Sequence, residues 1–348
     1  MGTPGMKTLA ERIAFLVSQR DTLEKWVGKY DEATLRKWLD SEIGDTRRLE
    51  DWVDRSKVVP RSPVLHVVSG NTPHAAFQSL FRAILLGCES WVKIPSSGLP
   101  EFEGWASSVA SLQVRRELPD EWKCPETAVI YGGAETISFF RDWLSPETRI
   151  IEHGPKLSAA FVFAEREGLA EELAEDIMRF GQRGCLSVQM VYVKADAELF
   201  CEKLAQVLES WGNSSNATSL SEAGGVRNER ELTRFRIANG AKSKMWESAG
   251  SADWTVVWDA ENKDLRAGPG SGFVRVAAMP DEISVATLGS EIRFLSTAVV
   301  EPISEADRLD AISPPRICPA GKAQEPGIFW HPDGEMPLAG LVRWRDLG

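Results

Sequence analysis

One cysteine of the chain stands in a sequence context that suits covalent chemistry. Cys185 ends the polar run Gly181-Gln182-Arg183-Gly184-Cys185, which separates a predicted amphipathic helix from a predicted strand. A thiolate in such a break can reach solvent, and backbone N–H groups or cations nearby would stabilise its charge and make it a strong nucleophile. Taken alone, a buried structural thiol is the commoner role for a cysteine. Both interpretations stay open on this evidence.

Asn71 is a second residue with chemical potential. It lies in Ser69-Gly70-Asn71-Thr72-Pro73, between a predicted strand and the start of a predicted helix. Asparagine at such a position commonly occupies a turn or caps a helix. Its side-chain amide could instead donate a hydrogen bond to an oxyanion. On its own, the position favours the turn or cap.

The sequence patterns of the common nucleotide-binding, serine hydrolase and metal sites are absent. The chain contains no G-x-G-x-x-G, no P-loop and no G-x-S-x-G segment,. The four histidines, at positions 66, 74, 153 and 331, have no metal-ligand spacing, and the five cysteines form no C-x-x-C pair,. We therefore expect no metal site and no disulfide framework.

The composition is that of an acidic globular protein. The chain has 348 residues, of which 43% are hydrophobic, and this length can form two sizeable cores,. A net charge of −11 without a Lys/Arg cluster argues against nucleic acid or an anionic membrane as partner,. No stretch approaches the roughly 18 apolar residues of a membrane span. Charged residues also interrupt the first twenty positions, so a cytoplasmic location is expected,.

Alternating strands and helices are expected to position these residues. Residues 7–54 show the spacing of short amphipathic helices,. Strands are predicted at 64–69, 90–94, 127–131, 149–151, 159–163 and 188–193, with helices at 73–86, 100–112, 134–144, 168–180 and 196–209 between them, and further strands at 254–258, 273–277 and 295–300. This alternation is typical of βαβ units with a parallel sheet. The Ser-, Asn- and Gly-rich residues 212–225 predict a mobile loop,.

Taken in order, several short segments resemble those of one family. The segments are His66-Val67-Val68-Ser69-Gly70-Asn71-Thr72-Pro73, Lys93-Ile94-Pro95-Ser96-Ser97, Tyr131-Gly132-Gly133, His153-Gly154-Pro155-Lys156-Leu157-Ser158, residues 176–185, His331-Pro332-Asp333-Gly334 and Leu341-Val342-Arg343-Trp344. Over about residues 62–348 the chain resembles the LuxC family of long-chain acyl-CoA (acyl-protein thioester) reductases, within the aldehyde dehydrogenase superfamily.

The resemblance implies roles for individual residues. Cys185 matches the catalytic nucleophile, and Asn71 matches the asparagine whose amide forms the oxyanion hole with the Cys185 backbone N–H. Lys93 matches the lysine that holds the adenosine ribose of the cofactor. Gly132-Gly133 matches the turn that passes close to the cofactor pyrophosphate. Glu152 falls where oxidising aldehyde dehydrogenases carry their general-base glutamate.

Ser96 bears on the choice of cofactor. It stands three residues after Lys93, where NAD-preferring relatives usually have glutamate. A carboxylate there would repel a 2′-phosphate, so Ser96 favours NADPH, with NADH as the alternative.

The resemblance also implies a fold and a reaction. The expected fold is an aldehyde dehydrogenase-like α/β architecture in two lobes, with N-terminal helices at 1–60, a nicotinamide cofactor-binding domain at 61–155, a catalytic domain at 156–310 and a C-terminal segment at 311–348 that returns to the core. His331 and Asp333 in that segment could approach the cleft, but loop structure is the favoured expectation. The expected reaction converts a fatty acyl-CoA or acyl-carrier thioester to an aldehyde, through a Cys185 thioacyl-enzyme and hydride from NADPH. A homo-oligomer or an acyl-transferring partner enzyme would be compatible with it.

Two alternatives to this reaction stay open. If Glu152 activates water against the thioacyl-enzyme, the protein would be an NAD(P)-dependent aldehyde oxidiser. The segment before Val64 is predicted to be helices alone and is shorter than the superfamily's N-terminal region. A catalytically silent acyl-binding subunit is therefore the second alternative.

Overall fold

A computed structural model describes residues 6–109, 112–211 and 219–348 of the chain. The chain forms two compact units. The first consists of Met1–Pro155 together with Glu325–Gly348, and the second of Lys156–Gln324. The final segment therefore belongs to the same unit as the N-terminus.

Three helices open the first unit, as the spacing of apolar residues predicts. They are α1 (Leu9–Ser18), α2 (Arg20–Val27) and α3 (Glu32–Ile43). A capping box between Thr8 and Glu11 starts α1, and the side chain of Asp31 accepts the Thr34 N–H at the start of α3,. Most of their apolar side chains are buried.

Among the described residues, the first unit holds a sheet of five parallel strands in the order β4-β3-β2-β5-β6. The strands are β2 (Val64–Val67), β3 (Ser90–Lys93), β4 (Leu112–Arg115), β5 (Thr127–Tyr131) and β6 (Arg149–His153), and the helices between them are α4 (His74–Leu86), α5 (Pro100–Ala106) and α6 (Ala134–Trp143). The helix predicted at 100–112 is too long, because α5 ends at Ala106 and β4 begins at Leu112.

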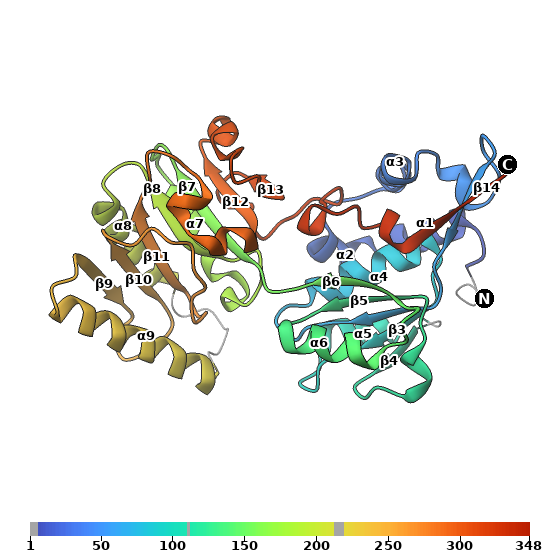
Figure 1. Cartoon of the computed structure of the whole chain (residues 1–348), viewed down its shortest axis with the longest axis horizontal. Helices are drawn as coiled ribbons and strands as arrows, with labels where there is room; N and C mark the ends of the chain where they lie inside the picture. The colour runs from blue at the N-terminus through green and yellow to red at the C-terminus, as the bar shows by residue number, and fades with distance from the viewer. Residues whose placement is uncertain (1–5, 110–111, 212–218) are drawn as a thin grey trace. The chain divides into compact units, whose positions relative to one another are not determined.

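The two faces of this sheet are covered by different helices. Leu65 and Val67 of β2 pack in one cluster with Ile137 of α6. His66 points to the opposite face, where its Nδ1 lies 2.7 Å from the Ser79 hydroxyl of α4. Figure 1 shows α6 on one side of the sheet and α1, α2 and α4 on the other. The parallel, two-sided arrangement confirms the βαβ interpretation.

Within residues 156–211 and 219–324, a second sheet has seven strands in the order β13-β12-β7-β8-β11-β10-β9. Only the β9–β10 pair in this sheet is antiparallel. The strands are β7 (Leu157–Val162), β8 (Val188–Val193), β9 (Ser243–Glu247), β10 (Thr255–Asp259), β11 (Phe273–Ala278), β12 (Leu295–Glu301) and β13 (Arg316–Cys318). Helices α7 (Leu169–Met178) and α8 (Ala197–Trp211) share a core cluster with Ala160 and Val162, while α10 (Val285–Leu288) shares another with Ala159 and Phe161. Burial on both faces explains the continuous apolar run of β7.

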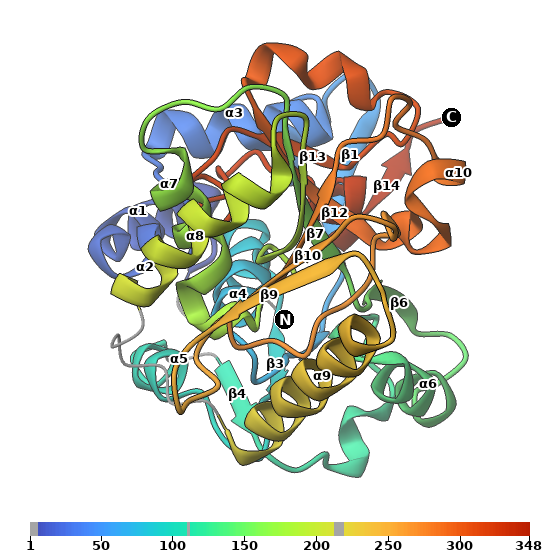
Figure 2. The same cartoon turned by 90° about the vertical axis from the view of Figure 1, so that its left-hand side faces the viewer.

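Helix α9 (Leu220–Ala238) corrects the loop predicted at 212–225. The loop prediction is wrong from residue 220 onward, and residues 212–218 lie outside the described part of the chain. A capping box between Ser219 and Glu222 starts α9, and Val226 packs against Phe273,. Figure 2 shows the helix beside β9. Tertiary packing thus overrides the loop-like composition of its first turn.

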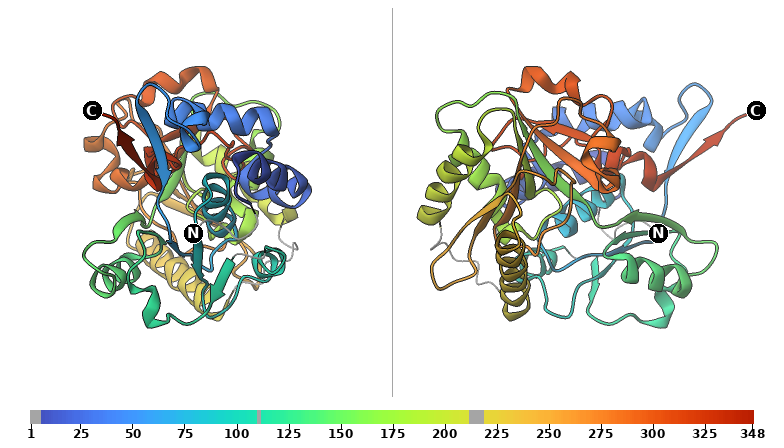
Figure 3. Two further views of the ribbon diagram at one scale, coloured as in Figure 1. Left: turned by 90° about the vertical axis from the view of Figure 1, so that its right-hand side faces the viewer. Right: turned by 60° about the vertical axis from the view of Figure 1, so that its left-hand side comes forward.

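A two-stranded ribbon joins the distant ends of the first unit. Strand β1 (Ser56–Pro60) pairs antiparallel with β14 (Val342–Asp346), and Val58 stands opposite Trp344. In the right-hand view of Figure 3, red β14 leads to the C-terminus. The prediction of helices alone before Val64 is therefore wrong, because β1 depends on a partner at the far end of the chain. In the described ranges, no helix combines the length and apolar character that crossing a bilayer requires.

Candidate active site

The candidate residues are distributed over both units. Cys185 lies in the second unit, and the other six candidates, which are Asn71, Lys93, Ser96, Gly132, Gly133 and Glu152, lie in the first.

The backbone of Cys185 is held by hydrogen bonds, and the residue is exposed. Its carbonyl oxygen accepts a 2.7 Å hydrogen bond from the Ser158 hydroxyl of β7 and a 3.2 Å bond from the Ser296 hydroxyl of β12. Both serines are buried. Cys88, Cys201 and Cys318 are also buried, whereas Cys185 and Cys124 are exposed. The structure therefore excludes the buried-thiol interpretation for Cys185.

The turn before Cys185 has an unusual backbone. Phe180, Gly181 and Gln182 have φ angles of 57°, 64° and 57°, a left-handed region that non-glycine residues seldom adopt,. Buried Gln182 holds this conformation, since its Nε2 donates to the carbonyl oxygens of Val188 (2.9 Å) and Phe273 (3.0 Å). A strained conformation that the surroundings hold in place is a common feature of functional turns.

An ion pair connects this turn to α9. The Arg183 guanidinium donates to both carboxylate oxygens of Glu222, at 2.7 and 2.9 Å. This contact lowers the pKa of Glu222 to about 2 and raises the pKa of Arg183. Helix α9 thus helps to hold the turn that carries Cys185.

A partly buried cation in the second unit, Arg316, interacts electrostatically with the Cys185 thiol. Arg316 stands opposite Thr297 in the β12–β13 register, one residue beyond Ser296. Its guanidinium donates 2.6 Å bonds to the carbonyl oxygens of Lys322 and Ala323. Burial lowers the pKa of Arg316, and the charges of Cys318, Asp176 and Cys185 oppose this effect. Local sequence patterns do not single out Arg316, because a charged residue before two apolar ones is a weak signal.

Asp176 is the buried acid of the same region. Its carboxylate accepts 2.8 Å bonds from the backbone N–H groups of Gly321 and Ala323. Burial nevertheless raises its pKa from 3.8 to about 7, because removing a carboxylate from water disfavours the charged form,. Asp176 and Arg316 therefore bind the same turn, at residues 321–323. Asp176 accepts bonds from its backbone N–H groups, and Arg316 donates to its carbonyl oxygens.

In the first unit, Asn71 is exposed in the bend between β2 and α4. Pro73 occupies the N-cap position of α4 without a capping side chain. The helix-cap interpretation of Asn71 is therefore wrong, and its amide makes no hydrogen bond to a residue that the structure describes. An amide in this position is available to an oxyanion.

The cofactor candidates lie where the strand order of the first sheet reverses. The chain proceeds from β2 to β3 and β4 on one side, and to β5 and β6 on the other. Ligands of doubly wound sheets bind at the carboxyl ends of the strands at such a switch point. The segments Gly70-Asn71 and Gly132-Gly133 follow the two central strands there. This position fits a dinucleotide.

Local contacts agree with that fit. Lys93 ends β3 and donates 2.8 Å to the Ile94 carbonyl oxygen, and partial burial lowers its pKa. Ser96 is exposed in the next turn. A Cβ added at Gly133 would meet no atom within 4 Å, which leaves room for a ligand. A Cβ at Gly132 would lie 2.8 Å from the Thr136 side chain, so that glycine is required by its own helix.

Glu152 has a strong partner inside the first unit. It lies on β6, and its two oxygens accept bonds of 2.5 and 2.6 Å from the Arg141 guanidinium of α6. The pairing raises the pKa of Arg141. A carboxylate engaged at both oxygens is poorly placed to take a proton from water.

The C-terminal segment contributes a contact that the sequence analysis did not foresee. Asp333 lies in a short turn, and its Oδ2 is 2.7 Å from Nδ1 of His153. The His153 ring also stacks on Tyr131, with centroids 4.4 Å apart. Asp333 is therefore a structural contact of β6 as well as a loop residue. No group of three or more His, Cys, Asp or Glu side chains suited to a metal ion occurs among the described residues.

Comparisons with known proteins agree on one family and one fold. The family model described as acyl-CoA reductase (LuxC) matches residues 6–344. The chain is 26% identical over 195 residues to the long-chain acyl-protein thioester reductase of Aliivibrio fischeri, a match that covers 49% of this chain and 41% of that protein. A second match, 23% identical over 200 residues, is to long-chain acyl-protein thioester reductase 2 of Photobacterium leiognathi, and it covers 50% of this chain and 41% of that protein. The matches thus span about two fifths of each relative.

Among solved structures, the chain is similar to aldehyde dehydrogenases. Aldehyde dehydrogenase 21 of Physcomitrella patens, in complex with the reaction product succinate, matches with a TM-score of 0.65 and 14% identity, over 99% of this chain and 87% of that one. The NADP-dependent glyceraldehyde-3-phosphate dehydrogenase of Bacillus halodurans, complexed with NADP, matches with a TM-score of 0.67 and 15% identity, over 98% and 86%. The chain therefore has the aldehyde dehydrogenase-like α/β fold, as the sequence predicted.

Proposed function

The chain belongs to the acyl-CoA reductase (LuxC) family, and on this basis we propose that it reduces an acyl thioester to an aldehyde through Cys185. The acyl donor would be a fatty acyl-CoA or an acyl group on a carrier protein. The named relatives are acyl-protein thioester reductases, which agrees with this substrate class.

The main support is the geometry of Cys185. Its backbone carbonyl is held by two buried serines while its thiol is exposed. A nucleophile needs this combination, because the attacking sulfur must reach substrate and its backbone N–H must keep a fixed direction. Buried cysteines cannot meet the first requirement.

The reaction follows from the groups that this chain supplies. The Cys185 thiolate attacks the thioester carbonyl carbon, and the negative charge moves to the carbonyl oxygen. The Cys185 N–H and the Asn71 amide stabilise that oxyanion; loss of one such donor typically costs about 10²–10³ in rate. The C–S bond to the carrier then breaks, the carrier thiolate leaves and takes up a proton, and the acyl group stays on Cys185.

Reduction requires the nicotinamide cofactor. When bound, NADPH supplies the hydride that reduces the acyl carbon. Lys93, Ser96 and Gly133 are the residues we propose to hold it, since they surround the carboxyl ends of β3 and β5. Arg316 would favour the thiolate form of Cys185 and its departure from the aldehyde, because a fixed cation stabilises an anion nearby.

Aldehyde oxidation is the less favoured alternative. It requires a general base that activates water, and Glu152 is the residue in the corresponding sequence position. The two short bonds from Arg141 occupy both oxygens of Glu152. This pairing supports the reductive direction.

A turnover assay tests the proposal. Octanoyl-, dodecanoyl- and tetradecanoyl-CoA, and a carrier protein loaded with the same acyl groups, would be incubated with NADPH, and the aldehyde trapped with a hydrazine. In parallel, the aldehydes would be offered with NADP⁺. We expect aldehyde from thioester, and much slower acid formation from aldehyde. Faster acid formation would identify an oxidiser, and no turnover in either direction would identify a silent acyl-binding subunit.

A further inference from the structure

The residues that follow Cys185 form a closed turn. The backbone N–H of Ser187 donates a 3.1 Å hydrogen bond to the Gly184 carbonyl oxygen, so that Cys185 and Leu186 stand at the centre of the turn. The Ser187 hydroxyl accepts a 2.9 Å bond from Nε2 of Gln324. Both Ser187 and Gln324 are buried. A side chain from a distant part of the sequence therefore holds the far end of the turn that carries the thiol.

Gln324 uses one nitrogen for two partners. Its Nε2 also donates a 3.2 Å bond to the backbone carbonyl oxygen of Asp176, in α7. An amide nitrogen carries two hydrogens and can bond both acceptors at once, whereas a carboxylate or a thioether has no hydrogen to donate. Gln324 thus ties the turn after Cys185 to the helix that precedes it.

The segment that carries Gln324 is itself anchored to α7. The Asp176 carboxylate accepts 2.8 Å bonds from the backbone N–H groups of Gly321 and Ala323. Gly321 has φ +74°, and a Cβ there would lie 3.3 Å from the side chain of Glu172. This close approach and the two bonds keep residues 321–324 against the helix.

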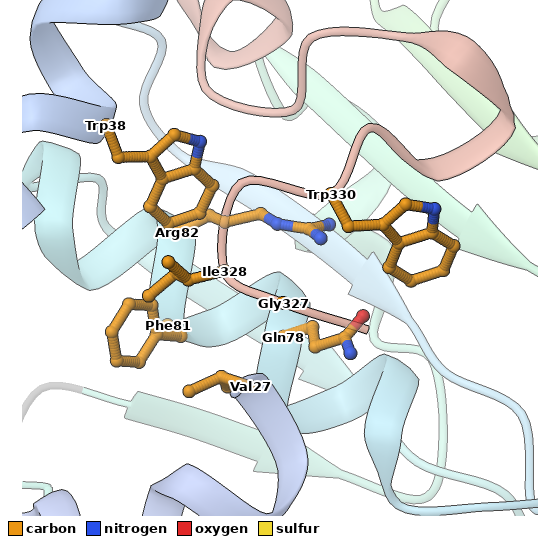
Figure 4. A pocket seen from close by; sticks show the side chains of 8 residues that line it. All are labelled: Val27, Trp38, Gln78, Phe81, Arg82, Gly327, Ile328 and Trp330. Carbon is orange, nitrogen blue, oxygen red and sulfur yellow. The ribbon is translucent and has the colours of Figure 1, made fainter. Parts of the chain in front are cut away.

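The chain is also held after Gln324. Gln324 is the last residue of the second unit, and the residues that follow it belong to the first. There, residues 327–330 and α4 line a small pocket with room for about one water molecule (Figure 4),. A Cβ at Gly28 would lie only 3.0 Å from the Pro326 carbonyl oxygen. The backbone is therefore closely packed both before and after Gln324.

Two buried glutamines thus hold the two ends of the Cys185 turn. Gln182, before the cysteine, donates to the carbonyl oxygens of Val188 and Phe273. Gln324 binds the turn after the cysteine, at Ser187. Hydrogen bonds between buried polar groups add little net stability, but they are directional and restrict a turn to one conformation. This arrangement suits a turn whose backbone must keep a fixed direction.

We propose that Gln324 is a positioning residue for Cys185 and acts through the Ser187 hydroxyl. The inference rests on the proposed function, in which Cys185 accepts the acyl group. During attack, negative charge develops on the carbonyl oxygen of the thioester, and the Cys185 backbone N–H must point at that oxygen to stabilise it. Gln324 keeps residues 184–187 in the conformation that gives this N–H its direction, without touching the substrate.

Two rates, measured on the full chain, separate positioning of the backbone from reactivity of the thiol. Acylation of Cys185 by octanoyl-CoA without nicotinamide passes through an oxyanion, whereas alkylation by iodoacetamide does not. Gln324→Met fills a similar volume without the N–H groups, and it should lower the acylation rate at least about tenfold and change the alkylation rate by less than about twofold. Timed mass spectrometry of the Cys185 peptide gives both rates.

The outcomes distinguish this inference from the proposed function. An unchanged acylation rate in Gln324→Met, or equal losses in both rates, would overturn the inference and leave Cys185 as the acyl acceptor. If the wild-type chain takes up no acyl group from octanoyl- or tetradecanoyl-CoA, the proposed function fails and the inference fails with it.

Ser187→Ala tests the same bond from its other end, and it also serves if Gln324→Met does not fold. It should slow acylation to a similar extent, and the double variant should be no slower than the slower single variant, because both changes remove one interaction. Losses that add in the double variant would overturn the route through Ser187.

Ser248→Ala is the matched control. Its hydroxyl is also buried and accepts a side-chain bond, from Nη2 of Arg230 at 3.1 Å. The substitution should lower Tm and leave the acylation rate unchanged. A loss of acylation as large as that in Ser187→Ala would assign the effect to general destabilisation and would overturn the positioning role.

Discussion

The Ser158 hydroxyl donates a 2.7 Å hydrogen bond to the backbone carbonyl oxygen of Cys185. The bond runs from β7, in the seven-stranded sheet of the second unit, to the turn that carries the exposed thiol. Ser296 reinforces it at 3.2 Å from the neighbouring strand. The direction of the Cys185 backbone is therefore set by two buried side chains of neighbouring strands.

Removing the Ser158 hydroxyl should loosen this turn. Ser158→Ala leaves the Cys185 carbonyl with the longer bond alone, and we expect the free energy of unfolding to fall by about 1 kcal/mol. The rate of thioester attack should fall as well, because the oxyanion-binding N–H loses its fixed direction. Urea denaturation and single-turnover kinetics measure the two effects. Ser296→Ala is the matched control and should have the smaller effect on both; an equal or larger effect would show that the shorter bond is not the dominant one.

Removing the Arg316 charge should make the Cys185 thiol less reactive near neutral pH. A fixed cation stabilises a thiolate, so Arg316→Gln should slow alkylation of Cys185 by iodoacetamide at pH 7, and the difference should vanish at high pH, where the thiol is ionised in either protein. Mass spectrometry of the Cys185 peptide gives the rate. Arg316→Lys should retain most of the reactivity. Equal alkylation rates for Arg316→Gln and the wild type would show that Arg316 does not stabilise the Cys185 thiolate.

Burial of Asp176 predicts a pH dependence of stability. The folded pKa, about 7, lies above the unfolded value of 3.8, so the folded chain binds the proton more tightly. The stabilising contribution of Asp176 to the free energy of unfolding is therefore fully present below about pH 4 and is lost as pH rises to about 7,. Over this range the free energy of unfolding should fall by up to about 1.4 kcal/mol per pH unit. The difference in unfolding free energy between wild type and Asp176→Asn, measured from pH 4 to 8, should show this slope. A difference independent of pH would contradict it.

The local pattern of the sequence predicts most elements that surround the site. Strands β2, β5, β7 and β8 and helices α1–α4 and α6–α8 follow from apolar spacing, because each forms its core contacts through a regular stripe or run. The resemblance then identifies Asn71 and Cys185 within the connections. Elements that depend on distant partners were missed: β1 needs β14, and β4 is a short strand at the sheet edge.

The contacts that refine the site were outside the reach of sequence patterns. Arg316 interacts with Cys185 only because β13 lies next to β12. His153 and Asp333 meet across 180 positions of the chain. The start of α9 was hidden because its Ser- and Gly-rich first turn is typical of loops, whereas the capping box and the buried Val226 decide the conformation. Side-chain partners of this kind follow from the fold and not from local composition.

Ser96 provides a test of the proposed cofactor preference. Ser96→Glu would place a carboxylate in the turn after β3, where we propose that the 2′-phosphate of NADPH binds. Repulsion between the two anions should raise the KM for NADPH by about tenfold and leave the KM for NADH unchanged or lower. Steady-state kinetics with both cofactors provide the measurement. Ser107→Glu, at the exposed end of α5, is the control for added charge and should change neither value. Equal increases for both cofactors would rule out a 2′-phosphate contact at Ser96.

The central claim is that Cys185 accepts the acyl group, and intact mass spectrometry without nicotinamide tests it most directly. The protein would be incubated with acyl-CoAs of increasing chain length, next to Cys185→Ala and Cys124→Ser, the latter lacking the other exposed cysteine. The account predicts one acyl adduct in the wild type and in Cys124→Ser, none in Cys185→Ala, and release of the acyl group as aldehyde when NADPH is added. An adduct that persists in Cys185→Ala, or no adduct with any thioester, would contradict it.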